Sequence, residues 1–219
     1  MKETLADSRW SELSARLGIF KPLVAFRWLE SRYRERARRY HDARHINECL
    51  RELDRSRHAE ASNPLVEYAL WFHDAVYNTF SKKNEERSAD AAVQVLERSG
   101  RPPADCSQVR SLILATRHGV QPIEPPLQLL VDIDLAILGA SANRYAEFEL
   151  QIRAEYWWVP TGMYRRQRAA ILKSFVSRPS IYATHEFREQ YERQARSNIA
   201  WGLEQLHIGL GSFRWTARF

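Results

Sequence analysis

The sequence predicts an all-α fold, and three observations carry this prediction. Apolar residues recur every three or four positions along most of the chain, which is the period of an α-helix. The 219 residues include only 8 glycines and 9 prolines, too few for the many turns of an all-β protein. No repeat or low-complexity segment divides the chain, so we expect a single domain over residues 1–219.

The chain before residue 55 is predicted to form the first helices. Helical apolar spacing begins at Leu13. A second stripe predicts a helix over residues 22–39, with Pro22 in its first turn. A break at residues 40–42 separates this helix from the next, which ends near residue 54.

The middle of the chain is predicted to contain the core. Asn63-Pro64 starts a helix over residues 64–77 whose centre is apolar on every side, so we expect it to be the core helix. Residues 78–85 are polar and predict a loop. Further helices are expected over residues 85–98 and 106–117.

The remaining apolar segments predict helices up to residue 206. Residues 127–140 fit a strand or a helix, and the length of the run and Gly139 at its end favour a helix. Three further stripes predict the helices 144–156, 167–176 and 185–206, followed by a loosely held tail over residues 207–219.

Charge and composition narrow the range of functions. The net charge is +6, and seven arginines fall between residues 27 and 44. This cluster is either a solvated helix face, because acidic residues are interspersed, or a surface that attracts phosphates. No run approaches the length of a membrane span, and neither a secretory signal nor a cysteine framework is visible. We therefore expect a cytoplasmic protein that does not enter a membrane.

Histidine and aspartate residues recur inside the apolar helical segments. They are His41 and His45, the adjacent pair His73-Asp74, and Asp132 and Asp134. A buried carboxylate beside a buried imidazole is costly unless something compensates, and a divalent cation does so economically. Two histidines four residues apart share a helix face, but they also occur as simple hydrogen-bond donors. Residues two apart diverge on a helix, so only one of the two later aspartates is expected to face an ion.

The order of these residues resembles the HD superfamily of metal-dependent phosphohydrolases. The segments RYHDARHI, ALWFHDAVY, NEERSA, LILATRH and DIDLAILGA together resemble a bacterial branch of predicted HD phosphohydrolases, over roughly residues 30–200. The resemblance implies an HD-domain-like helical bundle. Its metal-site core would span residues 30–140, and the helices over 141–206 would complete it.

The resemblance also implies roles for individual residues. The metal ligands would be His45, His73, Asp74 and Asp134, and the metal would be Mn, Fe, Co, Ni, Zn or Mg. The implied activity is hydrolysis of a small phosphorylated metabolite, with a nucleotide favoured. Asp74 would take part in catalysis, and Glu85 or Glu86 would assist proton transfer, although acidic residues also favour the first turn of a helix for structural reasons.

Several polar residues near these ligands are candidates for substrate binding. They are Arg44, His41, His118 and Arg178, with Arg117, Arg165 and Arg168 as further options. Tyr156, Trp157 and Trp158 either stack a base or pack in the core. The alternative function is a nucleic-acid-associated or regulatory ligand-binding protein with a structural metal site. Two measurements discriminate between these functions: turnover of a generic phosphoester with added Mn, and salt-dependent binding of DNA or RNA.

Overall fold

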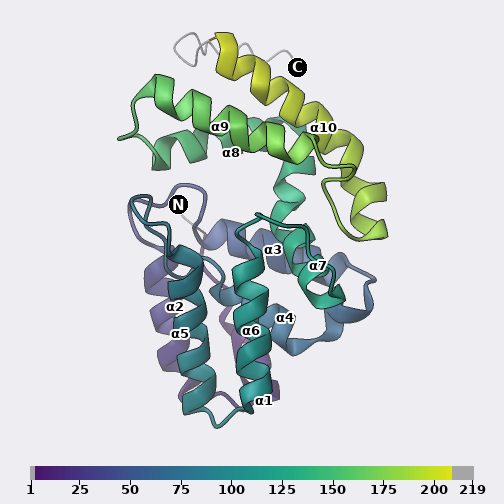
Figure 1. Cartoon of the computed structure of the whole chain (residues 1–219). Helices are drawn as coiled ribbons and strands as arrows, with labels where there is room; N and C mark the ends of the chain where they lie inside the picture. Colours follow the sequence, from purple (N-terminus) through teal and green to yellow (C-terminus); the bar gives the residue numbers. More distant parts are fainter. Residues whose placement is uncertain (1–2, 209–219) are drawn as a thin grey trace.

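The computed structural model describes residues 3–208, and this part of the chain contains helices and no strand, which confirms the all-α prediction (Figure 1). The elements are α1 (Asp7–Leu17), α2 (Pro22–Tyr33), α3 (Ala43–Arg55), η1 (Ala59–Ser62), α4 (Pro64–Phe72), α5 (Asn84–Arg98), α6 (Pro103–Ala115), α7 (Pro125–Leu135), η2 (Ala136–Gly139), α8 (Ala142–Glu155), α9 (Thr161–Val176) and α10 (His185–Ile208), where η marks a 3-10 helix.

Helix α4 is the centre of the fold. Every residue from Leu65 to Phe72 is buried, and the helix contacts α1, α3, α5, α6 and α7. The sequence predicts this position, because a helix that is apolar on every side must be covered on every side. Around it, α5 and α6 form an antiparallel hairpin beside α1 and α2 (Figure 1).

The helices α8, α9 and α10 form a second layer across one end of this bundle (Figure 1). Helix α10 packs on α9 and on η2. The contact with η2 depends on Gly139, where an added Cβ would lie 2.6 Å from the Cβ of Tyr191. The helices α3 and α7 lie at the junction of the two layers, so side chains from both layers meet there.

The prediction for the second helix is wrong at its end. Helix α2 stops at Tyr33 rather than at residue 39. The backbone N–H groups of Arg39, Tyr40 and His41 donate to the Glu155 carboxylate over 2.8–3.0 Å. A distant carboxylate thus takes donors that a continued helix would use, and it holds residues 34–42 as a connection.

The core helix is also shorter than predicted, because α4 ends at Phe72 rather than at residue 77. The buried guanidinium of Arg38 donates to the carbonyls of Asp74 and Ala75 over 2.6 and 3.0 Å. These carbonyls therefore have partners outside a helix. As a result, the His73-Asp74 pair lies just beyond a helix end rather than within a helix.

The later elements differ from the prediction in their bounds. Helix α6 begins at Pro103 and α9 at Thr161, both earlier than expected, with a proline at or directly before the first turn. The apolar run 127–140 is helical, but its last turn is the 3-10 turn η2. The predicted tail lies outside the described residues from residue 209 onward.

In the described part of the chain no single helix meets the length and hydropathy of a membrane span. The segments Pro125–Gly139 and Ala142–Glu155 meet them only when joined across a bend of 102°.

Candidate metal centre

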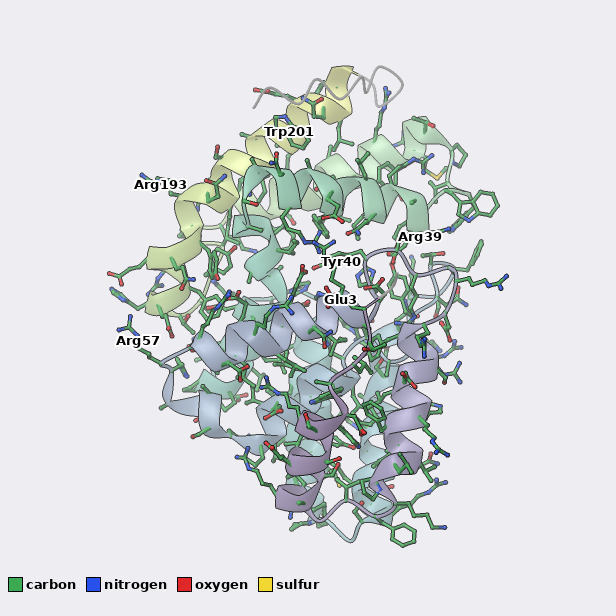
Figure 2. All side chains as sticks on the ribbon, turned by 180° about the vertical axis from the view of Figure 1, so that it is seen from behind. Glu3, Arg39, Tyr40, Arg57, Arg193 and Trp201 are labelled. Carbon is green, nitrogen blue, oxygen red and sulfur yellow. The ribbon has the colours of Figure 1, made fainter. Side chains whose placement is uncertain are left out.

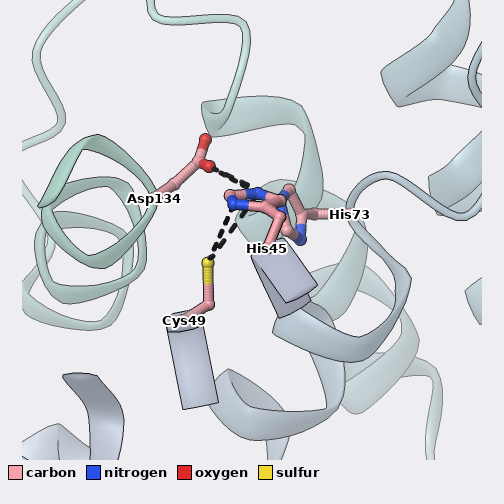
Figure 3. Close-up of side chains that lie close together, drawn as sticks. All are labelled: His45, Cys49, His73 and Asp134. Carbon is pink, nitrogen blue, oxygen red and sulfur yellow. Dashed lines mark hydrogen bonds and ion pairs between the residues drawn. The ribbon is translucent and has the colours of Figure 1, made fainter. Parts of the chain in front are cut away.

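Four side chains converge at the junction of the two layers. The Nε2 atoms of His45 and His73 lie 3.1 Å apart (Figure 3). Oδ2 of Asp74 lies 3.4 and 3.1 Å from these two nitrogens, and Oδ1 of Asp134 lies 3.2 and 3.5 Å from them. Helix α3 supplies His45 and helix α7 supplies Asp134, whereas His73 and Asp74 follow directly after the end of α4.

The spacing of these atoms fits a shared cation. Two ligands that each lie about 2.0–2.2 Å from one ion at tetrahedral or octahedral angles are about 3.0–3.5 Å apart. The five distances among the nitrogens and oxygens fall in this range. Both imidazoles are almost fully buried, with 2% of His45 and 1% of His73 exposed. Burial without an opposing charge would be costly for the carboxylates they face.

A hydrogen bond fixes the orientation of His73. Its Nδ1 lies 2.9 Å from the carbonyl oxygen of Leu70, which can only accept, so Nδ1 carries the proton. In the neutral ring, the Nε2 lone pair then points at the carboxylates. This is the arrangement in which histidine binds metals, with the second nitrogen held by a carbonyl or carboxylate.

The cluster attracts positive charge. Burial lowers the pKa of His73, but Asp74 and Asp134 more than offset this, and its pKa stands well above the ordinary value. The pKa of His45 is also raised well above its ordinary value against the effect of burial, by Cys49, Tyr40 and the same carboxylates. The pKa of Asp74 and that of Asp134 are held well below the usual range in spite of burial, chiefly by the imidazoles. A metal ion at this cluster would therefore compete with protons for the same atoms.

Cys49 is a neighbour of the cluster that the sequence analysis missed. His45, Cys49, His73 and Asp134 form a buried group that can hold a metal ion. The sulfur lies 3.7 Å from Nδ1 and 3.8 Å from Nε2 of His45, so it sits beside the ring rather than ahead of the Nε2 lone pair. Asp134 approaches the imidazoles from a different side (Figure 3). The signal for Cys49 was its position four residues after His45 on one helix.

The two aspartates of α7 point in different directions, as expected. Asp132 is fully buried and accepts hydrogen bonds from the Ala183 N–H and from the N–H and hydroxyl of Thr184, over 2.7–2.8 Å. Its role is to fix the start of α10 against α7. Asp134 alone faces the imidazoles.

His118 extends the cluster. Its Nε2 lies 3.0 Å from Oδ2 of Asp134, and its backbone has a φ of 56°, which is uncommon for a residue other than glycine. Arg178 donates to the His118 carbonyl over 2.6 Å. Arg178 thus contacts the cluster through the backbone of His118, and the strained conformation is held from both sides.

Half-buried His41 and buried Glu155 form a second pair beside the cluster. His41 precedes α3, so the expected helical pairing of His41 with His45 is wrong. Its Nδ1 lies 2.7 Å from Oε2 of Glu155, an oxygen that also accepts the hydroxyl of Tyr77 over 2.9 Å. Burial raises the pKa of Glu155, but His41 and the hydrogen bonds to residues 39–40 outweigh it and lower that pKa to about 2. No local sequence signal pointed to Glu155, which is 114 residues from His41.

A cavity of about 580 Å³ opens onto these groups. Its lining includes the predicted site residues His41, Asp74, Glu85, His118 and Asp134. Lys82, Arg117, Gln167 and Arg168 add polar groups, and aromatic rings complete the wall. Such a volume matches a small ligand. A second cavity of about 380 Å³ reaches His45, Cys49 and Asp134 from between α3, η2 and α10.

Four predicted site residues, Arg44, Glu86, Arg117 and Arg168, form ion pairs. Arg44 contacts Glu48 at 3.1 Å and Glu147 at 2.6 Å, which is the structural alternative for this residue. Glu86 pairs with Arg117, whereas Glu85 lines the cavity. The guanidinium of Arg168, which is partly buried, pairs with Glu149 at 2.8 Å. The structure thus leaves Glu85 with more access to the cavity than Glu86.

The three consecutive aromatic residues 156–158 lie in different surroundings. Tyr156 lines the cavity, whereas Trp157 is 76% exposed. The ring of Trp158 stacks on Phe80, with 4.2 Å between the ring centroids. Packing of both tryptophans in the core is therefore excluded.

Comparisons of the chain with protein-family models, with curated proteins and with solved structures found no match.

Proposed function

We propose that the protein is a metal-dependent phosphohydrolase that acts on a small phosphorylated metabolite, with a nucleotide as the favoured substrate. One observation carries the proposal: two imidazole nitrogens and two carboxylate oxygens converge within 3.1–3.5 Å, and both carboxylates line a cavity of ligand size.

In this proposal His45, His73, Asp74 and Asp134 hold the metal. A mixed nitrogen and oxygen set suits Mn, Fe, Co, Ni or Zn, and is less suited to Mg. When bound, such an ion supplies Lewis acidity toward a phosphoryl oxygen and lowers the pKa of water. His118 orients Asp134 through its bond to Oδ2. Cys49 stays beside the His45 ring.

His41 is the residue best placed to hold and give a proton. Its Nδ1 is bound to Glu155, so Nε2 is left without a partner among residues 3–208, and the residue lines the cavity. A histidine held by a buried carboxylate keeps one tautomer and one orientation. Glu85 is the second group available for proton transfer, because it lines the same cavity from the first turn of α5.

A test begins with metal-stripped protein. Bis(p-nitrophenyl) phosphate, p-nitrophenyl phosphate and a set of nucleotides are offered after addition of Mn, Co, Ni, Zn or Mg. We expect turnover with at least one ion. In Asp134→Asn we expect the turnover rate to fall by about 100-fold or more, because this substitution removes a proposed metal ligand. Asp132→Asn is the matched control, because it alters a buried carboxyl on the same helix. We expect it to lower the temperature of thermal unfolding and to leave the amount of bound metal unchanged.

Two results contradict the proposal. Metal retention without turnover of any phosphoester would support the ligand-binding alternative with a structural metal. Equal loss of bound metal in the two folded variants would show that the convergence at Asp134 is not the metal site.

A further inference from the structure

Three exposed aromatic side chains belong to two segments that also line the cavity of about 580 Å³ beside the candidate metal centre. The exposed fractions are 73% for Phe80, 76% for Trp157 and 37% for Trp158. The rings of Phe80 and Trp158 stack with an interplanar angle of 19°, and the indole of Trp158 donates to the Thr79 hydroxyl over 2.9 Å. This stack joins the α4–α5 connection to the turn between α8 and α9, which lie on the same side of the molecule (Figure 1).

The chain neighbours of these rings line the cavity. Ser81 and Lys82 follow Phe80, and Tyr156 precedes the two tryptophans. The rings are therefore carried by backbone segments that adjoin the cavity, and we take them as its rim. Exposed aromatic rings that cluster in this way typically mark a binding surface.

The same rim carries cations without partners. Arg39, Lys82 and Lys83 are exposed, and none of their side chains forms an ion pair within residues 3–208. Many other arginines of this chain are paired, as Arg44 and Arg168 are. The backbone N–H of Arg39 donates to Glu155, and Glu155 precedes Trp157 by two residues, so the backbone of Arg39 lies near the segment that carries the tryptophans.

Aromatic faces beside free cations suit one chemical class of ligand. Bases of a single strand stack on aromatic rings, and its phosphates attract lysine and arginine. A duplex hides the base faces and offers only its phosphates. The metal-site cavity takes a small ligand, whereas the rim extends the surface beyond it.

We propose that this rim, formed by Phe80, Trp157, Trp158, Arg39, Lys82 and Lys83, binds single-stranded nucleic acid and presents it to the cavity. Binding at the rim needs no metal. Presentation of the strand for hydrolysis rests on the proposed function.

The test measures binding without turnover. Fluorescence anisotropy of labelled ten-nucleotide single strands, RNA and DNA, is recorded with EDTA-treated full-length protein at several salt concentrations. We expect the Kd to rise about tenfold or more in Trp157→Ala, because base stacking is lost. In the double variant Lys82→Glu with Lys83→Glu we expect a similar rise in Kd, because phosphate contacts are lost. We also expect log Kd to depend less steeply on the logarithm of the salt concentration.

Matched controls change the same residue types elsewhere. Phe20→Ala removes a ring that is 58% exposed at the α1–α2 turn. Arg193→Glu reverses an exposed charge on α10, far from Arg39 (Figure 2). Both are expected to leave the Kd for the single strand within about twofold, as surface changes away from a site usually do.

The possible outcomes separate this inference from the proposed function. Equal affinity for duplex and single strand, equal effects of rim and control variants, or binding only to anionic phosphatidylglycerol vesicles would each overturn the inference. Turnover of small phosphoesters without strand binding would overturn it and leave the proposed function standing. Strand binding without any metal-dependent turnover would support the rim and contradict the phosphohydrolase.

Discussion

Replacement of Glu155 by glutamine is expected to destabilise the protein in a pH-dependent way. The side chain has no exposed surface and accepts from three backbone N–H groups, from His41 and from Tyr77. Glutamine keeps the shape, but its amide turns donors toward the His41 ring and the Tyr77 hydroxyl, which then lack an acceptor.

The magnitude follows from the lowered pKa. The pKa of Glu155 falls from the ordinary 4.5 to about 2, and at about 1.36 kcal/mol per pKa unit this corresponds to about 3 kcal/mol of folding free energy. Because the folded pKa is depressed, this stabilisation is present above about pH 4.5 and is lost as the pH falls toward 2. At pH 3.5 about 1 kcal/mol of it is gone.

Urea unfolding at pH 7.0, 5.0, 4.0 and 3.5 measures the effect. Glu155→Gln is expected to be less stable than the parent by about 3 kcal/mol at neutral pH and by about 2 kcal/mol at pH 3.5. Glu12→Gln alters an exposed glutamate and is expected to stay within about 0.5 kcal/mol of the parent throughout. A difference that does not change with pH, or one below about 1 kcal/mol at pH 7.0, would refute the reasoning.

Further predictions concern the metal centre and its surroundings. Cys49→Ser is expected to retain bound metal while Asp74→Asn loses it, as measured by elemental analysis after dialysis; the opposite result would make the thiolate the ligand. Because the pKa of both cluster histidines is raised, protons compete with the metal, so metal affinity in calorimetry is expected to fall from pH 8 to pH 6. Arg44→Ala is expected to leave phosphoester kinetics unchanged and to cost less than about 1 kcal/mol, since its ion pairs are partly exposed; a loss of substrate affinity would restore the site role. Arg38→Met, which leaves the carbonyls of His41, Asp74 and Ala75 without their donor, is expected to lower stability by about 3 kcal/mol or more in urea unfolding; an unchanged midpoint would contradict the structural role of this arginine.

Local patterns predicted a large part of the structure. The apolar sequence around Tyr68 identified the core helix. The spacing of Asp132 and Asp134 correctly implied that only one of them faces the histidines. These features depend on helical periodicity, which a sequence displays directly.

The contacts that end helices early were not predictable in the same way. Arg38 belongs to a run of arginines that resembles a solvated face, yet 1% of it is exposed and its guanidinium binds carbonyls 36 and 37 residues away. Glu155 looks like an ordinary glutamate near a helix end. Both act over long sequence separations, where tertiary contacts override local propensity.

The hydrogen bonds of Glu155 also determine when the site becomes complete during synthesis. The four converging side chains all lie between residues 45 and 134, whereas the carboxylate that holds His41 follows 114 residues after it. Closure of so long a loop must wait for α8 to be made and docked. A nascent chain that ends after α7 therefore contains all four converging side chains but lacks the carboxylate that holds His41. Convergence of the four side chains and fixation of His41 are thus separate steps of assembly, ordered by the direction in which the chain is synthesised.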